Sequence, residues 1–548
     1  MKTFLVDCYT TNVEQSKKID KFLALLDESG VCDLLSDDFN KEEKDETKGG
    51  RPPINIDNLF ACILFNFAFN KATVRDIEDK MRNDLRCIYL MQNEYPSHMT
   101  ISNFINNYIV PNQEKIFSLI TKAIFKKCNI NMETTYIDGS KFEANANKYK
   151  FVWKPTKFHL RLGEKIRQLL SQYNLLRGIP TSGIIESKLV ALKVNEFNNI
   201  LNEIDLTLKE NKHYLKSYNL LVEYLSKSLE YEEKEEICGP NRNSYFKTDK
   251  DATAMCLKED YYSGLGSNMH AAYNTQISVS NGLVTSYIVT QSRNDMPDFT
   301  LLLNRYYDFY NEYPKKVCAD SGYGSLDNYE YLDKHNIKNF VKYFSWNGNV
   351  SGRNPSQYRL NEDETITCLN GKIGYKSETN YHHRKANSIF YKIDGCIECM
   401  FSKYCKRYMK NKDEDFKIFE VNTSLQRYIQ QAEENLLSVE GIEMRVNRSI
   451  QVEGVFGVIK QDFQYERFRR RNLSKVSAEF MLICLGYNIR KLFKFFDDEC
   501  KFNYWKAPEN IKAETFKKPS AKRLSNKESK IKKKSINEES KVDYKYAK

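Results

Sequence analysis

The chain has 548 residues, of which 41% are hydrophobic, so two to four structural units are expected rather than a single core. No run of about 18 apolar residues occurs, and residues 1–7 lack a secretory apolar stretch, which argues against a membrane-spanning or exported protein. The net charge of +11 is concentrated after residue 500, where 15 basic and 6 acidic residues form a Lys- and Ser-rich tail. The rest of the chain is nearly neutral, so any DNA-binding groove must be a local patch.

The first predicted unit is helical and occupies residues 1–130. Apolar residues at helical spacing begin after the Gly- and Pro-containing segment 49–53 and include Leu59, Ile63 and Phe67. Ser97 precedes a further helical run, where it is a good N-cap. Short helices of this kind form helix-turn-helix units whose second helix can enter a major groove. This unit is a candidate DNA-binding domain, and a purely structural helical cap is the alternative.

Asp138 ends the first predicted strand, 134–138. A long Leu-rich helical segment, 156–236, follows and is broken at Gly178-Ile179-Pro180. We interpret it as a helical bundle or coiled-coil arm inserted into the core. Simple packing on the core, dimerisation and bridging of DNA ends all remain open for this arm.

The chain then predicts a hairpin followed by alternating helices and strands. Strands 270–280 and 283–291 are joined by Asn281-Gly282, the strongest short hairpin signal. A helix at 298–310, a strand at 316–320, a helix at 326–336 and a strand at 338–344 come next. Asp320 ends the fourth strand, as Asp138 ends the first.

A second insertion, about 346–420, contains the densest group of the chain's cysteines. Cys396 and Cys399 have Cys-x-x-Cys spacing, and Cys368 and Cys405 flank them. Four such thiolates suit a tetrahedral zinc site, which would supply folding energy to a small insertion. His382 and His383 are rival ligands, and unligated thiols or redox chemistry are the other interpretations.

Glu453 lies in a helical pattern, 448–460, near the C-terminal end of the core. Together with Asp138 and Asp320 it would make an oxygen-rich pocket for hard divalent cations. Such pockets can hold two metals about 3.5–4 Å apart for phosphoryl transfer. The sequence therefore predicts an enzyme that cuts or joins nucleic acid. Glu443 is the second choice for the third acid, while Asp295 and Asp298 favour helix capping.

Three ordered segments resemble the acidic blocks of DDE transposases from bacterial insertion sequences. They are 136–147 around Asp138, 319–323 around Asp320 and 452–460 around Glu453. The nearest group is the insertion-sequence 1182 family, of the RNase H-like superfamily. The resemblance extends from about Arg51 to Leu492, and three blocks in order are far more specific than one.

The resemblance implies an α/β fold with an RNase H-like catalytic core assembled from 131–155, 237–345 and 421–497. Four further segments complete the division: an all-helical DNA-binding domain (1–130), the helical insertion (156–236), the cysteine-containing insertion (346–420) and a basic, disordered tail (498–548). Asp138, Asp320 and Glu453 would ligate two Mg²⁺ ions, for which Mn²⁺ can substitute. The expected reaction is cleavage at transposon ends and transfer of the 3′-hydroxyls into target DNA.

Basic residues near the glutamate are candidate DNA contacts. Related elements carry a Tyr-x2-Arg-x3-Glu-x6-Lys signature; here Lys460 keeps its spacing, whereas Arg448 stands five residues before Glu453 instead of four. Arg469 and Arg470 belong to a basic run that could track the DNA backbone.

Tyr149 and Trp153 could stack on an extruded base, with ordinary packing as the alternative.

The expected partners are the terminal inverted repeats and target DNA, bound by a homodimer in the bacterial cytoplasm and associated with the nucleoid. Two other functions stay open. One is a catalytically decayed, sequence-specific DNA-binding protein; the other is an RNase H-like nuclease without strand transfer.

Overall fold

The computed structural model describes residues 7, 14–40, 54–69, 73–204, 208–240, 242–257, 268–344, 346, 358–378, 388–406, 409, 411–497 and 505–514. His382 and His383, the rival zinc ligands, lie outside the described residues. So does the predicted basic tail, except for 505–514.

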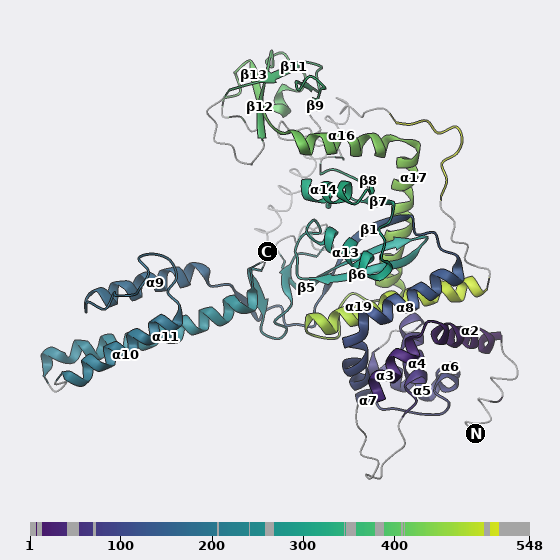
Figure 1. The fold of residues 1–548 in the computed structure, drawn as a ribbon, viewed down its shortest axis with the longest axis horizontal. Coiled ribbons are helices and arrows are strands. Elements are labelled where there is room, and N and C mark those ends of the chain that lie inside the picture. Colours follow the sequence, from purple (N-terminus) through teal and green to yellow (C-terminus); the bar gives the residue numbers. More distant parts are fainter. Residues whose placement is uncertain are drawn as a thin grey trace, which may run out of the picture.

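The N-terminal part is helical and lies below the central sheet in Figure 1. Its elements are α2 (Glu14–Glu28), α3 (Val31–Asn40), α4 (Ile56–Phe69), α5 (Val74–Asn83), α6 (Leu85–Leu90), α7 (His98–Phe104), the π-helix η1 (Ile105–Ile109) and α8 (Val110–Cys128). The side chain of Ser97 accepts a hydrogen bond from the Thr100 amide, so the predicted N-cap of α7 is confirmed. Most of α4 is buried, because it packs against the long C-terminal helix α19 (Leu473–Phe496).

A mixed sheet forms the centre of the molecule. Its main path is β4-β5-β1-β7-β8, and β6 pairs with β5. The strands are β1 (Thr134–Glu143), β4 (Thr253–Met255), β5 (His270–Ser280), β6 (Leu283–Thr290), β7 (Lys316–Ala319) and β8 (Lys338–Val341). β1 is antiparallel to β5 and parallel to β7, which is parallel to β8. The predicted hairpin is confirmed: Asn281 and Gly282 both have positive φ, as a tight two-residue turn requires.

Alternating side chains of the strands divide the interior into two layers. Tyr136, Cys318 and Phe340 pack with the N-terminal helices and α19 on one face. Ile137 and Val317 pack on the other face with α13 (Asp298–Tyr310) and α14 (Leu326–Lys334). β7 and β8 are thus buried on both faces, as expected for parallel strands covered by helices on both sides.

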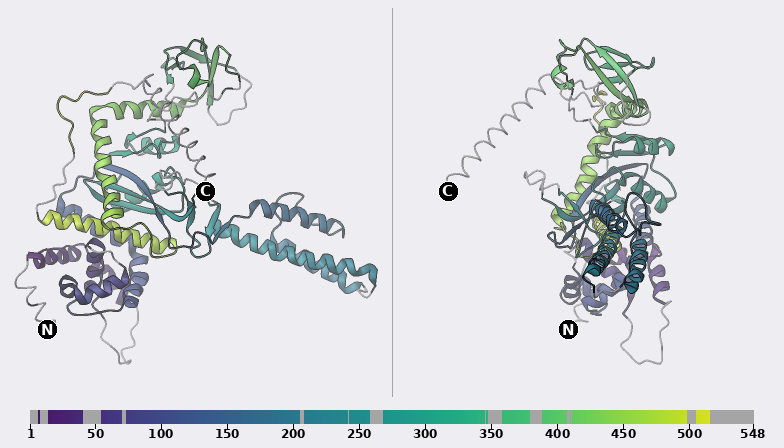
Figure 2. Two further views of the ribbon diagram at one scale, coloured as in Figure 1. Left: turned by 180° about the vertical axis from the view of Figure 1, so that it is seen from behind. Right: turned by 90° about the vertical axis from the view of Figure 1, so that its left-hand side faces the viewer.

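A helical arm leaves the core between two short paired strands, β2 (Phe151–Trp153) and β3 (Ser244–Phe246). It consists of α9 (Thr156–Ser171), α10 (Ser187–Glu203), the 3₁₀ turn η2 (Lys209–Asn211) and α11 (Lys212–Cys238). Figures 1 and 2 show it projecting sideways from the core. The arm has its own apolar core, centred on Ile166, Val190 and Phe197.

A second, smaller sheet lies beyond the far end of the central sheet (Figure 1). Its order is β13-β12-β11-β10-β9, built from β9 (Tyr358–Leu360), β10 (Ile366–Cys368), β11 (Ile373–Lys376), β12 (Ser388–Asp394) and β13 (Phe416–Asn422), with the short helix α15 (Ser402–Cys405). Helices α16 (Thr423–Leu437) and α17 (Val439–Arg448) then return the chain to the core.

The predicted continuous helix through Glu453 is wrong in detail, because two π-helical turns interrupt it. After α17 come η4 (Ser449–Glu453), α18 (Gly454–Gly457) and η5 (Val458–Asp462). Each π turn holds one residue more than an α turn, and such turns cluster at functional sites. Across the described ranges, no helix is both long enough and apolar enough to cross a membrane.

Candidate active site

Asp138 and Asp320 are brought together by the pairing of β1 with β7. The parallel register runs up to Tyr136 opposite Cys318, and each aspartate stands two residues beyond that pair. Neighbouring strands lie about 4.8 Å apart and side chains two residues apart share a face. Both carboxylates therefore lie side by side, on the face of the sheet to which Tyr136 and Cys318 belong. The predicted strand 316–320 is one residue too long, since β7 ends at Ala319 and Asp320 begins the following turn.

Short-range hydrogen bonds orient both carboxylates. The Gly139 amide donates to Oδ1 of Asp138 (3.0 Å), and the Gly322 amide donates to Oδ1 of Asp320 (2.8 Å). A Cβ on Gly322 would stand 3.0 Å from that same oxygen, so the turn fits closely around Asp320. Each carboxylate keeps its second oxygen for another partner.

The helix that carries Glu453 lies on this same face. The Tyr136 hydroxyl and the Cys318 thiol both contact Met444 of α17 (3.7 and 3.6 Å). The chain continues from α17 directly into η4, at whose last residue Glu453 stands with its side chain 54% exposed. The structure thus gathers the three predicted acids from two adjacent strands and one helix.

Arg448 bridges two of these acids. Its guanidinium lies 3.3 Å from Oδ2 of Asp138 and 3.0 Å from Oε1 of Glu453, and its side chain is only 8% exposed. Residues five apart in an α-helix point about 140° away from each other, but a π turn closes between residues i and i+5. The extra residue in η4 therefore explains why Arg448 reaches Glu453 at a spacing of five.

Burial and charge act against each other at this site. Burial raises the pKa of Asp138 to about 6, while Arg448 lowers it and the negative charges of Asp320 and Glu453 raise it. The neighbouring carboxylates raise the pKa of Arg448 although burial opposes this, so the guanidinium is charged. Lys342, directly after β8, is a further cation near Asp320 that sequence reasoning missed; burial and Arg448 lower its pKa.

A side-chain network on β5 supports the site, and no sequence pattern predicts it. The Tyr323 hydroxyl donates to Oε1 of Gln276, and Nε2 of Gln276 donates to Asp295 (2.8 Å). Gln276 pairs with Gly139 across β1 and β5, and a Cβ on Gly139 would stand 2.3–2.6 Å from the Gln276 amide group. A side chain at the position after Asp138 would therefore have to displace the Gln276 amide group, which is held by Tyr323 and Asp295.

The predicted capping by Asp295 and Asp298 is wrong: the N-cap of α13 is Pro297, and no side-chain hydrogen bond caps this helix. Asp298 begins α13, but its carboxylate also accepts from the Thr290 hydroxyl (2.6 Å) and from Asn274 (3.3 Å). Burial raises the pKa of Asp298 to about 6. Asp295 also accepts from Asn274 (2.8 Å), so both acids tie α13 to β5.

The rival third acid, Glu443, is engaged elsewhere. It accepts a hydrogen bond from the Ala507 amide (2.9 Å) and lies 3.8 Å from Lys506. Glu453, in contrast, contacts the same guanidinium as Asp138. The geometry therefore favours Glu453 over Glu443 as the partner of the two aspartates.

The three carboxylates have the oxygen ligands that Mg²⁺ prefers. The guanidinium of Arg448 lies between two of them, at a position where their charges favour a cation. Within the described ranges, no group of three or more His, Cys, Asp or Glu side chains is already arranged to hold a metal ion. At the acidic site, the Arg448 contacts stand between Asp138 and Glu453. A divalent cation fits this donor set if those contacts give way to it.

The predicted DNA-contacting cations have partners within the protein. Nζ of Lys460 lies 5.2 Å from the ring centroid of Phe142, on the strand that carries Asp138. The Arg470 guanidinium donates to Asn106 of η1 (2.7 Å), and that of Arg469 lies 5.8 Å from the Tyr465 ring. The backbone amides of Arg469 and Arg470 both donate to the carboxylate of Glu479. The basic run therefore contributes to folding, whatever else it contacts.

The four cysteines of the second insertion gather at one end of the small sheet. Cys368 ends β10, and Nζ of Lys372, in the following turn, donates to the Gly395 carbonyl next to Cys396. The Cys399 carbonyl accepts from the Ser402 amide (2.8 Å) at the start of α15, whose last residue is Cys405. Burial raises the pKa values of both Cys396 and Cys405, and so do the charges of Cys368 and Cys399. Cys396 also raises the pKa of Cys405.

Two family models match the chain. The model of a transposase DDE domain matches residues 367–493, which include Glu453 but neither aspartate. The model of a transposase domain (DUF772) matches residues 8–107, within the helical N-terminal part. No match is found among the curated proteins or among the solved structures.

These matches agree with the arrangement of the site. A DDE domain implies an RNase H-like core and a phosphoryl-transfer enzyme, and the central sheet has the corresponding antiparallel and parallel strands. The two domains together indicate DNA transposition activity. The chain is therefore similar to transposases over two separate stretches, residues 8–107 and residues 367–493.

Proposed function

We propose that this protein cleaves DNA at the ends of its own element and joins the resulting 3′-hydroxyls to target DNA, in an Mg²⁺-dependent reaction. The observation that carries the proposal is the convergence of Asp138, Asp320 and Glu453 on one face of the sheet, linked through Arg448. Carboxylates from two central strands and a helix suit phosphoryl transfer, because such transfers need fixed charge near the reacting phosphate.

Asp138, Asp320 and Glu453 would hold the metal ions. Bound Mg²⁺ activates the attacking oxygen and stabilises charge on the leaving oxygen. The chain supplies the positioning: backbone amides of Gly139 and Gly322 orient the two aspartates.

We assign phosphate binding to Arg448. Its Nε is buried without a hydrogen-bond partner among the described residues, and a DNA phosphate oxygen would satisfy that donor. Lys460, on the next helical segment, and Arg469 and Arg470, beyond it, are the other proposed DNA contacts.

The proposal includes an organisation for the whole chain. We assign terminal-repeat binding to residues 1–130 and catalysis to the core formed by 131–155, 237–345 and 421–497. We also propose that the protein belongs to the insertion-sequence 1182 family. Two element ends must be processed together, so the working form is a homodimer on DNA.

We further propose that Cys368, Cys396, Cys399 and Cys405 bind structural zinc. Their convergence at one end of the small sheet supports this, since that sheet has a core of few large apolar residues. Four thiolates are soft ligands that suit zinc, and binding would require the thiols to move, because the described residues hold no group already arranged around a metal ion.

The decisive experiment uses DNA that carries the element's own ends and compares wild type with Glu453→Ala in Mg²⁺. We expect the variant to bind the ends normally but to lose cleavage and 3′-end joining by at least about 100-fold. Glu443→Ala is the matched control, and it should retain activity because Glu443 faces the 505–514 segment.

Each other outcome points to a different function. End binding without any cleavage by the wild type would favour a decayed DNA-binding protein. Cleavage without joining would favour an RNase H-like nuclease. Activity that survives in Glu453→Ala and disappears in Glu443→Ala would move the third acid to Glu443.

A further inference from the structure

A strongly aromatic and basic segment, residues 147–158, connects β1 to the helical arm. Lysines and aromatic residues alternate in it, and it contains no acidic residue. Its four aromatic side chains are Tyr149 (80% exposed), Phe151 (45%), Trp153 (55%) and Phe158 (61%). So much exposed aromatic surface within twelve residues is unusual for a folded protein and typical of a binding surface.

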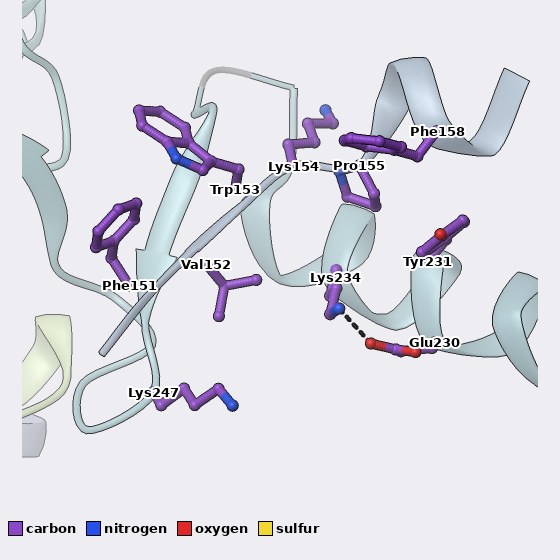
Figure 3. Close-up of a pocket in the computed structure, with 10 residues that line it drawn as sticks. All are labelled: Phe151, Val152, Trp153, Lys154, Pro155, Phe158, Glu230, Tyr231, Lys234 and Lys247. Carbon is purple, nitrogen blue, oxygen red and sulfur yellow. Dashed lines mark hydrogen bonds and ion pairs between the residues drawn. The ribbon is translucent and has the colours of Figure 1, made fainter. Parts of the chain in front are cut away.

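Three of these side chains, those of Phe151, Trp153 and Phe158, line an open pocket of about 430 Å³ at the base of the arm (Figure 3). Strand β2 supplies one wall, where Phe151 and Trp153 are in edge-to-face contact with ring centroids 5.5 Å apart. Phe158 of α9 and Tyr231 of α11 lie on the opposite side. The pocket therefore presents aromatic surface from three separate elements.

The pocket is held in an ordered framework. β2 pairs with β3, and Phe151 packs on the buried Phe246 (6.4 Å). The Lys154 amide donates to the Asn243 carbonyl (2.8 Å), and the Lys247 amide donates to Lys150 (2.9 Å). The exposed aromatic residues are thus fixed by backbone pairing, which lowers the entropy cost of binding a ligand.

The charge around the pocket is positive. Lys154, Lys234 and Lys247 line it together with a single acid, Glu230, which is ion-paired with Lys234. Lys247 is exposed, as are Lys150 and Lys157 nearby. Exposed lysines beside aromatic faces are the combination with which proteins bind single-stranded nucleic acid, stacking the bases and following the phosphates.

The pocket lies shortly after the strand that carries Asp138 in the chain. The segment continues directly from β1, whose residues between Asp138 and Glu143 span about 17 Å. Beyond that strand, Arg467 and Arg471 donate to the carbonyls of Ala144 and Asn145 and so hold the segment to the core.

We propose that this pocket binds unpaired bases of DNA near the cleavage point, with Trp153 and Phe158 as the stacking surfaces and Lys247 as a phosphate contact. Unpaired bases fit better than a duplex, because bases within a duplex already cover each other's faces. The proposal rests on the proposed function for the identity of its natural ligand, but the pocket can be tested without catalysis.

The test measures binding of fluorescein-labelled oligo(dT) to the full chain in EDTA, alone and annealed to oligo(dA). Each stacked base contributes about 1–3 kcal/mol, so Trp153→Ala should weaken oligo(dT) binding about 5- to 150-fold and affect duplex binding far less. Trp153→Phe keeps a stacking ring and should restore most of the affinity. Lys247→Ala should weaken both ligands and reduce the salt dependence of binding. Tyr375→Ala, which removes an exposed aromatic residue from the small sheet, is the matched control.

Unchanged oligo(dT) binding by both Trp153→Ala and Phe158→Ala would overturn the proposal. So would a change of oligomeric state in these variants without a change in oligo(dT) affinity, since a second copy would then be the occupant. If oligo(dT) binding depends on Trp153 while the wild type fails to cleave element ends, the pocket stands and the proposed function falls. If cleavage occurs and the variants bind normally, the pocket alone falls.

Discussion

Gly139 illustrates how a residue without a side chain can determine a catalytic geometry. The Gln276 side chain crosses β1 through the space where a Cβ of residue 139 would stand, and it then reaches both Asp295 and Tyr323. Because Gly139 also donates its amide to Asp138, a shift of this backbone would move the aspartate itself.

We therefore expect Gly139→Ala to destabilise the fold by about 1–3 kcal/mol through overpacking. Activity on element ends should fall on the order of 100-fold, because displacement of the aspartate misplaces the reacting groups. Thermal unfolding and the cleavage assay measure the two effects.

A double-mutant cycle separates this explanation from general damage. In a Gln276→Ala background the stability cost of Gly139→Ala should nearly vanish, since the clash is then removed. Gly457→Ala is the control: a Cβ there meets no atom within 4 Å, so a small stabilisation of about 0.5–1 kcal/mol is expected. Equal costs in both backgrounds would contradict the role given to Gln276.

Arg448 shows how one buried cation can serve two states of a site. In this structure it offsets the charge of Asp138 and Glu453, which burial would otherwise make costly. When a cation and a DNA phosphate are present, the same guanidinium can turn its donors to the phosphate.

At the scale of elements, the cysteine-containing insertion gives the clearest test. We expect the purified protein to contain a single structural zinc ion per chain, and Cys399→Ser to lose it. Cys256→Ser is the control, because Cys256 lies outside the cluster and its thiol contacts the Leu257 carbonyl. Elemental analysis gives the metal content, and thermal unfolding with and without a chelator gives the effect on stability.

Retention of zinc by Cys399→Ser, or protein that neither contains zinc nor takes it up, would show that these thiols are unligated. Loss of zinc in the control as well would place the metal elsewhere in the chain.

At the scale of the whole molecule, the C-terminal residues carry a net positive charge that the rest of the chain largely lacks. Residues 515–548 contain 12 basic and 4 acidic residues. The preceding 505–514 segment is attached to the fold, since the Trp505 amide donates to Asn447 (2.9 Å) and the Glu514 amide donates to Leu437 (2.8 Å). Truncation after Glu514 should therefore leave the fold intact.

This truncation should weaken binding to arbitrary duplex DNA on the order of tenfold at low salt, with a shallower dependence of affinity on salt. Fluorescence anisotropy at several salt concentrations measures both quantities. Truncation before Trp505 is the comparison, and it should also lower the melting temperature because contacts to α17 are lost. An unchanged salt dependence after the first truncation would mean that the tail does not contact DNA.

The elements and the three acids could be predicted from the sequence because their signals are local. Alternating apolar residues and Asn281-Gly282 specify the hairpin within residues 270–290, and Asp138 and Asp320 each follow a short apolar run directly. Other features depend on residues far apart in the chain. The Gln276 network joins β5 to β1 and the turn after β7, and Arg470 meets Asn106 across more than three hundred residues. The π turn η4, across which Arg448 reaches Glu453, packs against β1 and β5, which lie far from it in the chain. Backbone pattern therefore determined the strands and the acids, and tertiary packing decided which side chains surround them.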